Sequence, residues 1–321
     1  MIKALVAAVG GVALIGLIVW FGGREIGVEV WQAGWAIPIN IVIHLIQLFS
    51  AGCAWRLLVG ERQFPPLAFF RFRLVREGVN SLLPVAQIGG PLVAIRLMVK
   101  DGISGALAGA GTTLDLTVEA VMQLVFTLAG LGLLGAQGAD SEWVPWVEGG
   151  VGLGAIGLLV FITAQRAGLM RLIEGLFNRL RKYFPGLSAD MLQGLHQELI
   201  RLQKERWALA GAALFHFLSW AGGTFEIYVG LFAMGHEVGL REAFIIESLG
   251  MAARSAGFAV PGALGVQEGG FILVCGLFGI TPDMGLALSM LKRLREIIVG
   301  SAGLLTWQWS ELSRWLKGKR A

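Results

Sequence analysis

Long apolar runs separated by short polar connections dominate the chain. Six runs approach or exceed the roughly 20 apolar residues that a helix needs to cross a bilayer. They cover residues 2–21, 34–59, 103–134, 146–164, 207–234 and 283–308. The pattern predicts an all-α polytopic membrane protein with about six full spans. We expect the first run to be a retained helix rather than a signal peptide, because it is long and no small-residue cleavage motif follows it.

Two further apolar segments, 67–99 and 242–279, are interrupted by proline and glycine. The first interruption reads NSLLPVAQIGGP (80–91) and the second PGALGVQEGG (261–270). Proline and glycine disfavour a continuous helix, and each break leaves arms of roughly 14–19 residues, which is short for a span. The residues expected to form the two turns are Pro84, Gly89, Gly90, Pro261, Gly262, Gly265, Gly269 and Gly270.

Loop charge decides how these two broken segments insert. Basic residues gather in 165–206 and in the C-terminal tail, whereas the connection 135–145 holds Asp140 and Glu142 and no Lys or Arg. The positive-inside rule places 165–206 and the C-terminus in the cytoplasm. If the N-terminus is also cytoplasmic and both broken segments are re-entrant hairpins, every basic loop falls inside and every acidic loop outside. The two hairpins then open from opposite sides of the membrane, the first from the cytoplasm, and both termini are cytoplasmic. The cations expected at the base of the first hairpin are Arg71, Arg73, Arg76, Arg96 and Lys100.

Two consequences follow from the hairpins. Non-helical backbone at membrane depth must face protein or a water-filled cavity, so a polar interior is expected. The two halves also match at a constant offset of 177 residues. The matching pairs are Pro84 and Pro261, Gly102 and Gly279, and Glu119 and Glu296. We therefore predict two inverted repeats, 1–134 and 146–308, the layout of secondary transporters. An ancient duplication without a transport function is the alternative.

The stretch 165–206 is expected to form a cytoplasmic insert. Over 169–184 its apolar residues line one helical face and its basic residues the rest, as in helices that lie on a membrane surface. A helical connector with an apolar face is an equal alternative. Ser188 would cap a second helix over 189–207.

Composition supports a membrane protein and excludes several other classes. The chain has 321 residues, of which 55% are hydrophobic and 15% charged, against roughly 25% charged in soluble domains. The net charge of +4 fits loop charge that sets orientation rather than nucleic-acid binding. Cys53 and Cys275 lie inside apolar runs, so no disulfide framework is expected. Neither a Walker motif nor metal-ligand spacing is present, so we predict no metal and no cofactor.

Ionisable residues inside the apolar runs are the candidates for function, because their burial is costly. Asp115 and Glu119 lie one turn apart on one helical face. They are either a proton site or counter-ions for arginines. The isolated His44 and His216 are expected to be packed or hydrogen-bonded rather than ligands. The residues expected to balance charge or carry a proton are Asp115, Glu119 and Glu296.

The last span carries Lys292, Arg293 and Arg295 too deep for all of them to reach the surface comfortably. Such cations suit an anionic head group. The alternative is a salt-bridge network with Asp115, Glu119 and Glu296, and both interpretations can hold. The residues expected to bind the head group are Arg254, Lys292, Arg293, Arg295, Gln267, Glu268, Asn80 and Gln87.

Glu268 itself has two interpretations. A carboxylate at the start of the second arm is favoured as a helix cap. Otherwise Glu268 lines the cavity beside Arg254.

The runs 247–280 and 286–307, with the motif P-G-x-L-G-x-x-E-G, resemble the lysylphosphatidylglycerol synthase transmembrane (flippase-like) family. Within it, the sequence is most similar to the hopanoid-biosynthesis-associated HpnL subgroup. Fused relatives carry a soluble aminoacyl-transferase domain that makes the lipid, and these 321 residues contain no counterpart of it. The resemblance implies a lipid flippase fold and a role for Pro261, Gly262, Gly265, Glu268, Gly269, Lys292, Arg293 and Glu296.

These observations favour a transporter that moves a phospholipid-like or hopanoid lipid between leaflets of the bacterial inner membrane through a polar midplane cavity. One alternative is an intramembrane enzyme that modifies a lipid head group, with a base such as Glu268. Another is a scaffold for lipid-biosynthesis proteins. The expected partner is a membrane lipid, and no nucleic acid is expected.

Overall fold

The computed structural model describes residues 23–60, 63–83, 89–136, 189–257 and 260–318, with the isolated positions 149, 152, 156 and 159. Every regular element in these ranges is a helix. The elements are α2 (Gly23–Gln32), η1 (Ala33–Trp35), α3 (Ala36–Val59), α4 (Pro66–Leu82), α5 (Gly89–Lys100), α6 (Gly105–Gly135), α9 (Ala189–Leu202), α10 (Arg206–Ala233), α11 (Leu240–Ala256), η2 (Pro261–Ala263), α12 (Val266–Gly276) and α13 (Pro282–Gly318). The predicted span 2–21 and the amphipathic helix 169–184 lie outside the described residues, as does most of 146–164.

Three segments of the described chain are long and apolar enough to cross a membrane: Val30–Val59, Gly105–Gly135 and Arg206–Ala233. They coincide with the runs predicted over 34–59, 103–134 and 207–234, so these helices are confirmed. Helix α13 has 37 residues and is therefore about 55 Å long. It continues past the predicted end at residue 308, because the charged residues that end the apolar run are good helix formers.

The chain breaks its helices at both predicted interruptions. Helix α4 ends at Leu82 and α5 begins at Gly89, while α11 ends at Ala256 and α12 begins at Val266. In the second break Gly262 and Gly265 have φ of 64° and 80°, in the left-handed region that glycine adopts without a steric cost. The first turn, which includes Pro84 and Gln87, lies outside the described residues.

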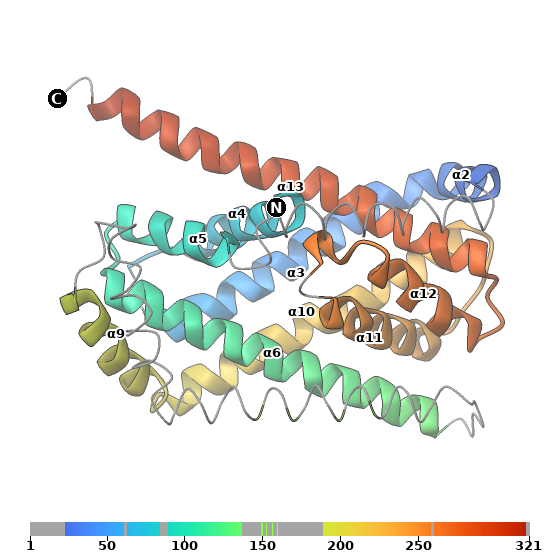
Figure 1. Ribbon diagram of the computed structural model, residues 1–321, viewed down its shortest axis with the longest axis horizontal. Coiled ribbons are helices and arrows are strands. Elements are labelled where there is room, and N and C mark those ends of the chain that lie inside the picture. Colours follow the sequence, from blue (N-terminus) through green and yellow to red (C-terminus); the bar gives the residue numbers. More distant parts are fainter. Residues whose placement is uncertain are drawn as a thin grey trace.

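The broken pairs occupy different halves of the molecule (Figure 1). Helix α4 packs on α5 and α11 packs on α12, while the turn η2 of the second pair contacts α4 of the first. The element order also repeats, since a long helix, a broken pair and a second long helix occur as α3–α6 and again as α10–α13. Gly102 and Gly279 both have positive φ, 105° and 71°, at matching positions. How the two halves insert in a bilayer stays a prediction.

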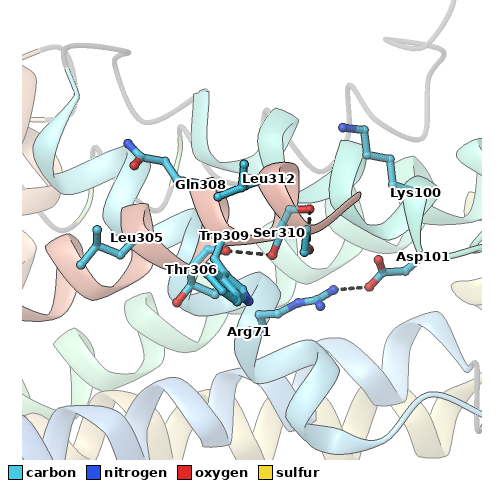
Figure 2. Close-up of a pocket in the computed structure, with 10 residues that line it drawn as sticks. Arg71, Lys100, Asp101, Leu305, Thr306, Gln308, Trp309, Ser310 and Leu312 are labelled. Atoms are coloured by element: carbon cyan, nitrogen blue, oxygen red, sulfur yellow. Dashed lines mark hydrogen bonds and ion pairs between the residues drawn. The ribbon is translucent and has the colours of Figure 1, made fainter. Parts of the chain in front are cut away.

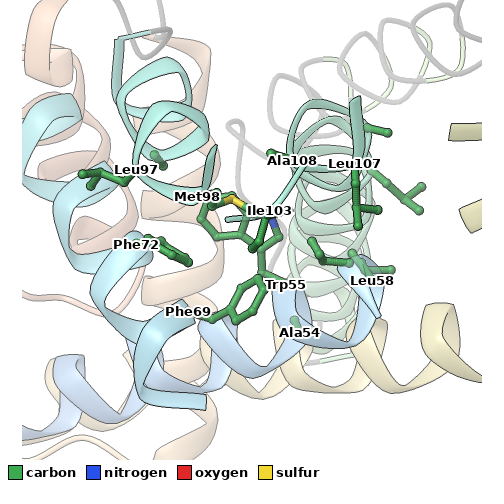
Figure 3. Close-up of a cluster of buried hydrophobic side chains, with 14 of the residues drawn as sticks. Ala54, Trp55, Leu58, Phe69, Phe72, Leu97, Met98, Ile103, Leu107 and Ala108 are labelled. Carbon is green, nitrogen blue, oxygen red and sulfur yellow. The ribbon is translucent and has the colours of Figure 1, made fainter. Parts of the chain in front are cut away.

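Two large apolar cores, and a smaller one of Leu48, Leu74 and Val299, hold the described helices together. The first surrounds Trp55 and Phe69, whose rings meet edge-on with centroids 6.2 Å apart, and gathers side chains from α3, α4, α5, α6, α9 and α10 (Figure 3). The second surrounds Phe271 and involves α6 and α10–α13. Along α6, Leu114 belongs to the first core and Leu134 to the second. Between these two positions α6 carries the polar side chains of Asp115, Glu119 and Gln123.

Helices α4 and α13 approach so closely that their backbones touch. A Cβ atom on Gly78 would lie 2.4 Å from the carbonyl oxygen of Gly300, and one on Gly303 would lie 2.2 Å from that of Leu74. Small residues at such crossings are characteristic of membrane helix packing, where close contact replaces the hydrophobic effect as the driving force.

The second helix of the predicted insert is shorter than expected. It was predicted over 189–207, but α9 ends at Leu202 and α10 begins at Arg206 after a short turn. Helix α9 packs on α6, and Leu199 and Leu202 are buried in the first core. This part of the insert is therefore attached to the bundle.

Candidate functional site

A polar cavity of about 310 Å³ lies among α3, α4, α6, α10, α11 and α13. It takes side chains from both halves of the chain, including α4 of the first broken pair and α11 of the second. Its charged lining residues are Arg73, Arg76, Glu77, Glu119, Glu247, Arg254, Lys292, Arg295 and Glu296. Such a density of buried charge inside a bundle of apolar helices marks this cavity as the candidate site.

The first of two ion clusters joins α4 to α6. Arg76 donates to Asp115 at 2.9 Å and to Glu119 at 2.6 Å, and Arg73 donates to Glu119 at 2.9 Å. His216 Nε2 lies 2.9 Å from the second oxygen of Asp115. The two guanidinium groups and the two carboxylates balance in charge, as a buried ionic group requires.

Arg73 and Arg76, which were predicted at the base of the first hairpin, are buried. Their exposed fractions are 8% and 6%. They turn inward because Asp115 and Glu119 lie opposite them on α6 and compensate the cost of burial. Of the other predicted base cations, Arg71 pairs with Asp101, and Lys100 pairs with Glu311.

The second cluster centres on α13. Lys292 Nζ lies 2.8 Å from Glu247 and 3.2 Å from Glu226. Arg295 donates to Glu226 at 2.8 Å and also contacts Nδ1 of His44. Gly223 makes room for this arrangement, because a Cβ atom there would lie 2.2 Å from Glu247 Oε1.

Arg254 extends the second cluster to the second broken pair. It pairs with Glu296 and donates to Gln267 Oε1 at 2.7 Å. Gln267 in turn donates to Ser289 at 3.0 Å, and Arg293 lies 3.2 Å from Glu296. The cluster holds four cations and four carboxylates: Arg254, Lys292, Arg293 and Arg295 with Glu226, Glu247, Glu268 and Glu296.

Glu268 combines the cap with an ion pair. One oxygen accepts the backbone N–H of Gly265 at 2.6 Å, and the other accepts from Arg293 Nε at 2.7 Å. Its side chain is fully buried, and it is not among the residues that line the cavity. Glu268 therefore caps α12 and ties it to α13.

The partners of the α13 cations differ from those suggested by the sequence. The hypothetical network joined them to Asp115, Glu119 and Glu296. In the structure Glu296 does pair with them, but Asp115 and Glu119 pair with α4 instead. Glu226 on α10 and Glu247 on α11 take the places of those two carboxylates.

The uncharged polar candidates have structural partners. Asn80 lines the cavity, and its Oδ1 accepts the backbone N–H of Gly90 at 3.0 Å across the first break. A Cβ atom on Gly90 would lie 2.4 Å from that oxygen, and one on Gly270 would lie 2.4 Å from Ala253 Cβ. Both glycines therefore permit close packing at the breaks. Gln87 lies outside the described residues.

A larger, more open hollow of about 1020 Å³ lies where α13 passes the ends of α4 and α5 (Figure 2). Its lining includes the Arg71–Asp101 ion pair, Trp309 and Lys100. None of the residues of the two ion clusters lines it. We therefore assign the candidate site to the smaller buried cavity, where the compensated charges are.

Comparison with known families completes the picture of the site. The model of the lysylphosphatidylglycerol synthase TM region matches residues 2–303. The chain belongs to this family. Membership in the lysylphosphatidylglycerol synthase TM family supports a membrane protein with a lipid-related function. No curated protein matches the chain, and no solved structure does.

Proposed function

We propose that this member of the lysylphosphatidylglycerol synthase TM family is a lipid flippase. A phospholipid-like or hopanoid lipid would pass its head group through the polar cavity while its apolar part stays in the bilayer. The observation that carries the proposal is the cavity of about 310 Å³, lined by compensated charges from both halves of the chain. A polar path through apolar helices is what a head group needs to cross hydrocarbon.

The chemistry of the lining favours a head group with an anionic part. The Nε atoms of Arg73, Arg76 and Arg295 are buried and make no hydrogen bond within the described part of the chain. All three side chains line the cavity. Guanidinium groups bind phosphate oxygens through charge-assisted hydrogen bonds. A phosphate that enters here would compete with the carboxylates of the two clusters for these guanidinium groups.

The proposal extends to membrane orientation. Two re-entrant hairpins that enter from opposite sides would bring their turns together beside the cavity, consistent with the contact between η2 and α4. The loop charges favour an orientation with both termini in the cytoplasm, and the membrane we propose is the bacterial inner membrane. The resemblance of the sequence to the HpnL subgroup is the reason to include a hopanoid lipid in the proposal.

Lipid translocation in proteoliposomes tests the proposal. We expect the purified chain to move a fluorescent phosphatidylglycerol between leaflets, and Arg254→Gln and Arg295→Gln to slow this by about tenfold or more. Glutamine keeps hydrogen bonding but removes the charge. Arg201→Gln is the matched control, because the Arg201 side chain is 55% exposed on α9. Translocation equal to that of protein-free liposomes would refute the flippase, and wild-type rates in both cavity variants would refute the site.

A further inference from the structure

Glu77 differs from every other carboxylate at the cavity. It lies on α4, one turn from Arg73 on one side and Ser81 on the other, and all three line the cavity. Within the described residues it forms no ion pair, and its hydrogen bond comes from Ser81 Oγ at 3.3 Å. The adjoining segments 84–88 and 258–259 contain no Lys or Arg.

Among the described charged residues of the site, Glu77 is the carboxylate that no cation balances. The two clusters contain the cations Arg73, Arg76, Arg254, Lys292, Arg293 and Arg295, and the carboxylates Asp115, Glu119, Glu226, Glu247, Glu268 and Glu296. With neutral histidines these charges cancel. Ionised Glu77 therefore gives the site one net negative charge, and a proton on Glu77 makes it neutral.

Glu77 also lies between the two clusters. It lines the cavity together with Arg73 of the first cluster and Arg254 of the second. Glu77 and Arg254 are 177 residues apart, so they occupy equivalent positions of the predicted repeats with opposite charge. The titratable and charged groups that share the cavity with it are His44 on α3, Arg73 and Arg76 on α4, Glu119 on α6, Glu247 and Arg254 on α11, and Lys292, Arg295 and Glu296 on α13.

We propose that Glu77 is a proton-binding residue that couples proton uptake to the entry of an anionic head group. An anionic phosphate beside ionised Glu77 would bring the site to two net negative charges, which disfavours both. One proton from water on a Glu77 oxygen reduces this to one, and Ser81 Oγ provides a hydrogen-bond partner for the carboxylic acid. When the head group leaves, the proton returns to water. The proposal rests on the proposed function, because it assumes a phosphate-bearing ligand.

Binding of a short-chain phosphatidylglycerol to the full chain in detergent tests the coupling directly. The affinity of the wild type should rise as the pH falls, by up to about tenfold for each pH unit, because one proton is bound with the lipid. Glu77→Gln mimics the protonated acid and should bind with little dependence on pH. Glu237→Gln, an exposed position between α10 and α11, should keep the wild-type slope.

Three results would overturn the assignment. The first is a wild-type affinity that does not change with pH. The second is a Glu77→Gln variant that keeps the wild-type slope, which would move the proton to another group. The third is an affinity that depends on Na⁺ at constant pH and loses this dependence in Glu77→Gln, which would make the site a sodium site.

Translocation separates this proposal from the function on which it rests. In liposomes of phosphatidylcholine and phosphatidylglycerol, an imposed pH gradient should change the net flux of fluorescent phosphatidylglycerol by the wild type but not by Glu77→Gln. If the pH gradient does not change the net flux by the wild type, proton coupling is refuted, while the flippase proposal still stands. Absence of flux under every condition would refute the flippase, and the pH slope of binding would still decide whether Glu77 binds the proton.

Discussion

Arg293 and the buried Glu268 form an ion pair of 2.7 Å that fixes the break between α11 and α12 to α13. Arg293 also donates to the carbonyl oxygen of Gly262 at 2.5 Å and to that of Ala263 at 3.3 Å. Glu268 accepts the N–H of Gly265 with its other oxygen. One side chain from each helix thus satisfies backbone groups that the broken helix leaves unpaired.

Removing either side chain should destabilise the protein. We expect Glu268→Ala to lower the free energy of unfolding by about 3–5 kcal/mol, because it leaves Arg293 buried with less compensation and removes the cap. Glu268→Gln should cost less, since its amide oxygen still accepts the N–H of Gly265. Chemical unfolding in detergent measures both, with Glu237→Ala as the control. Equal and negligible effects of both Glu268 changes would contradict this role.

The pair of Lys292 and Glu247 should behave as a coupled unit. Lys292→Met leaves two carboxylates without their shared cation, so we expect a large loss of stability. Glu247→Gln should then cost less in the Lys292→Met background than in the wild type. A double-mutant cycle on unfolding should give a coupling energy of about 0.5–3 kcal/mol. Simple additivity would show that the contact contributes nothing specific.

The contact between α4 and α13 should not accept a methyl group. Gly303→Ala brings a Cβ atom against the Leu74 carbonyl, and such overpacking costs about 1–3 kcal/mol. Gly132→Ala is the matched control, since nothing lies within 4 Å of a Cβ atom at that position of α6. The apparent melting temperature in detergent should fall for Gly303→Ala only. A fall of the same size in both variants would point to a general effect of helix glycines instead.

Cysteine labelling from either side of the membrane tests the hairpin topology. In a background without Cys53 and Cys275, cysteines at Gln63 and Lys100 should react from the cytoplasmic side, and those at Glu237 and Thr281 from the opposite side. Lys204→Cys marks the cytoplasmic side as a control. If 242–279 crossed the membrane once, the cysteines at 237 and 281 would react from opposite sides.

Much of the fold follows from local sequence. Apolar run length fixes α3, α6 and α10 to within a few residues, and proline and glycine mark both breaks. Ion partners do not follow, because they depend on which helices become neighbours. Glu226 on α10 looks isolated in the sequence, yet it meets Lys292 and Arg295 of α13.

The position of charged residues near the first break was also hard to predict. Arg73, Arg76 and Glu77 follow one another closely and resemble the charged end of a surface helix. Only the packing of α4 against α6 and α13 turns them toward the cavity. The signal in the sequence was their place on an arm that ends in a break, where a polar interior was expected.

The glycine crossing of α4 and α13 has a mechanical consequence. Gly78 and Gly303 let the backbones of α4 and α13 touch with no side chain between them, so this crossing joins the two halves of the chain directly. In the proposed transport, the two halves would move about this crossing. The ion pairs farther from it, such as those of Lys292 with α10 and α11, would have to break in such a movement.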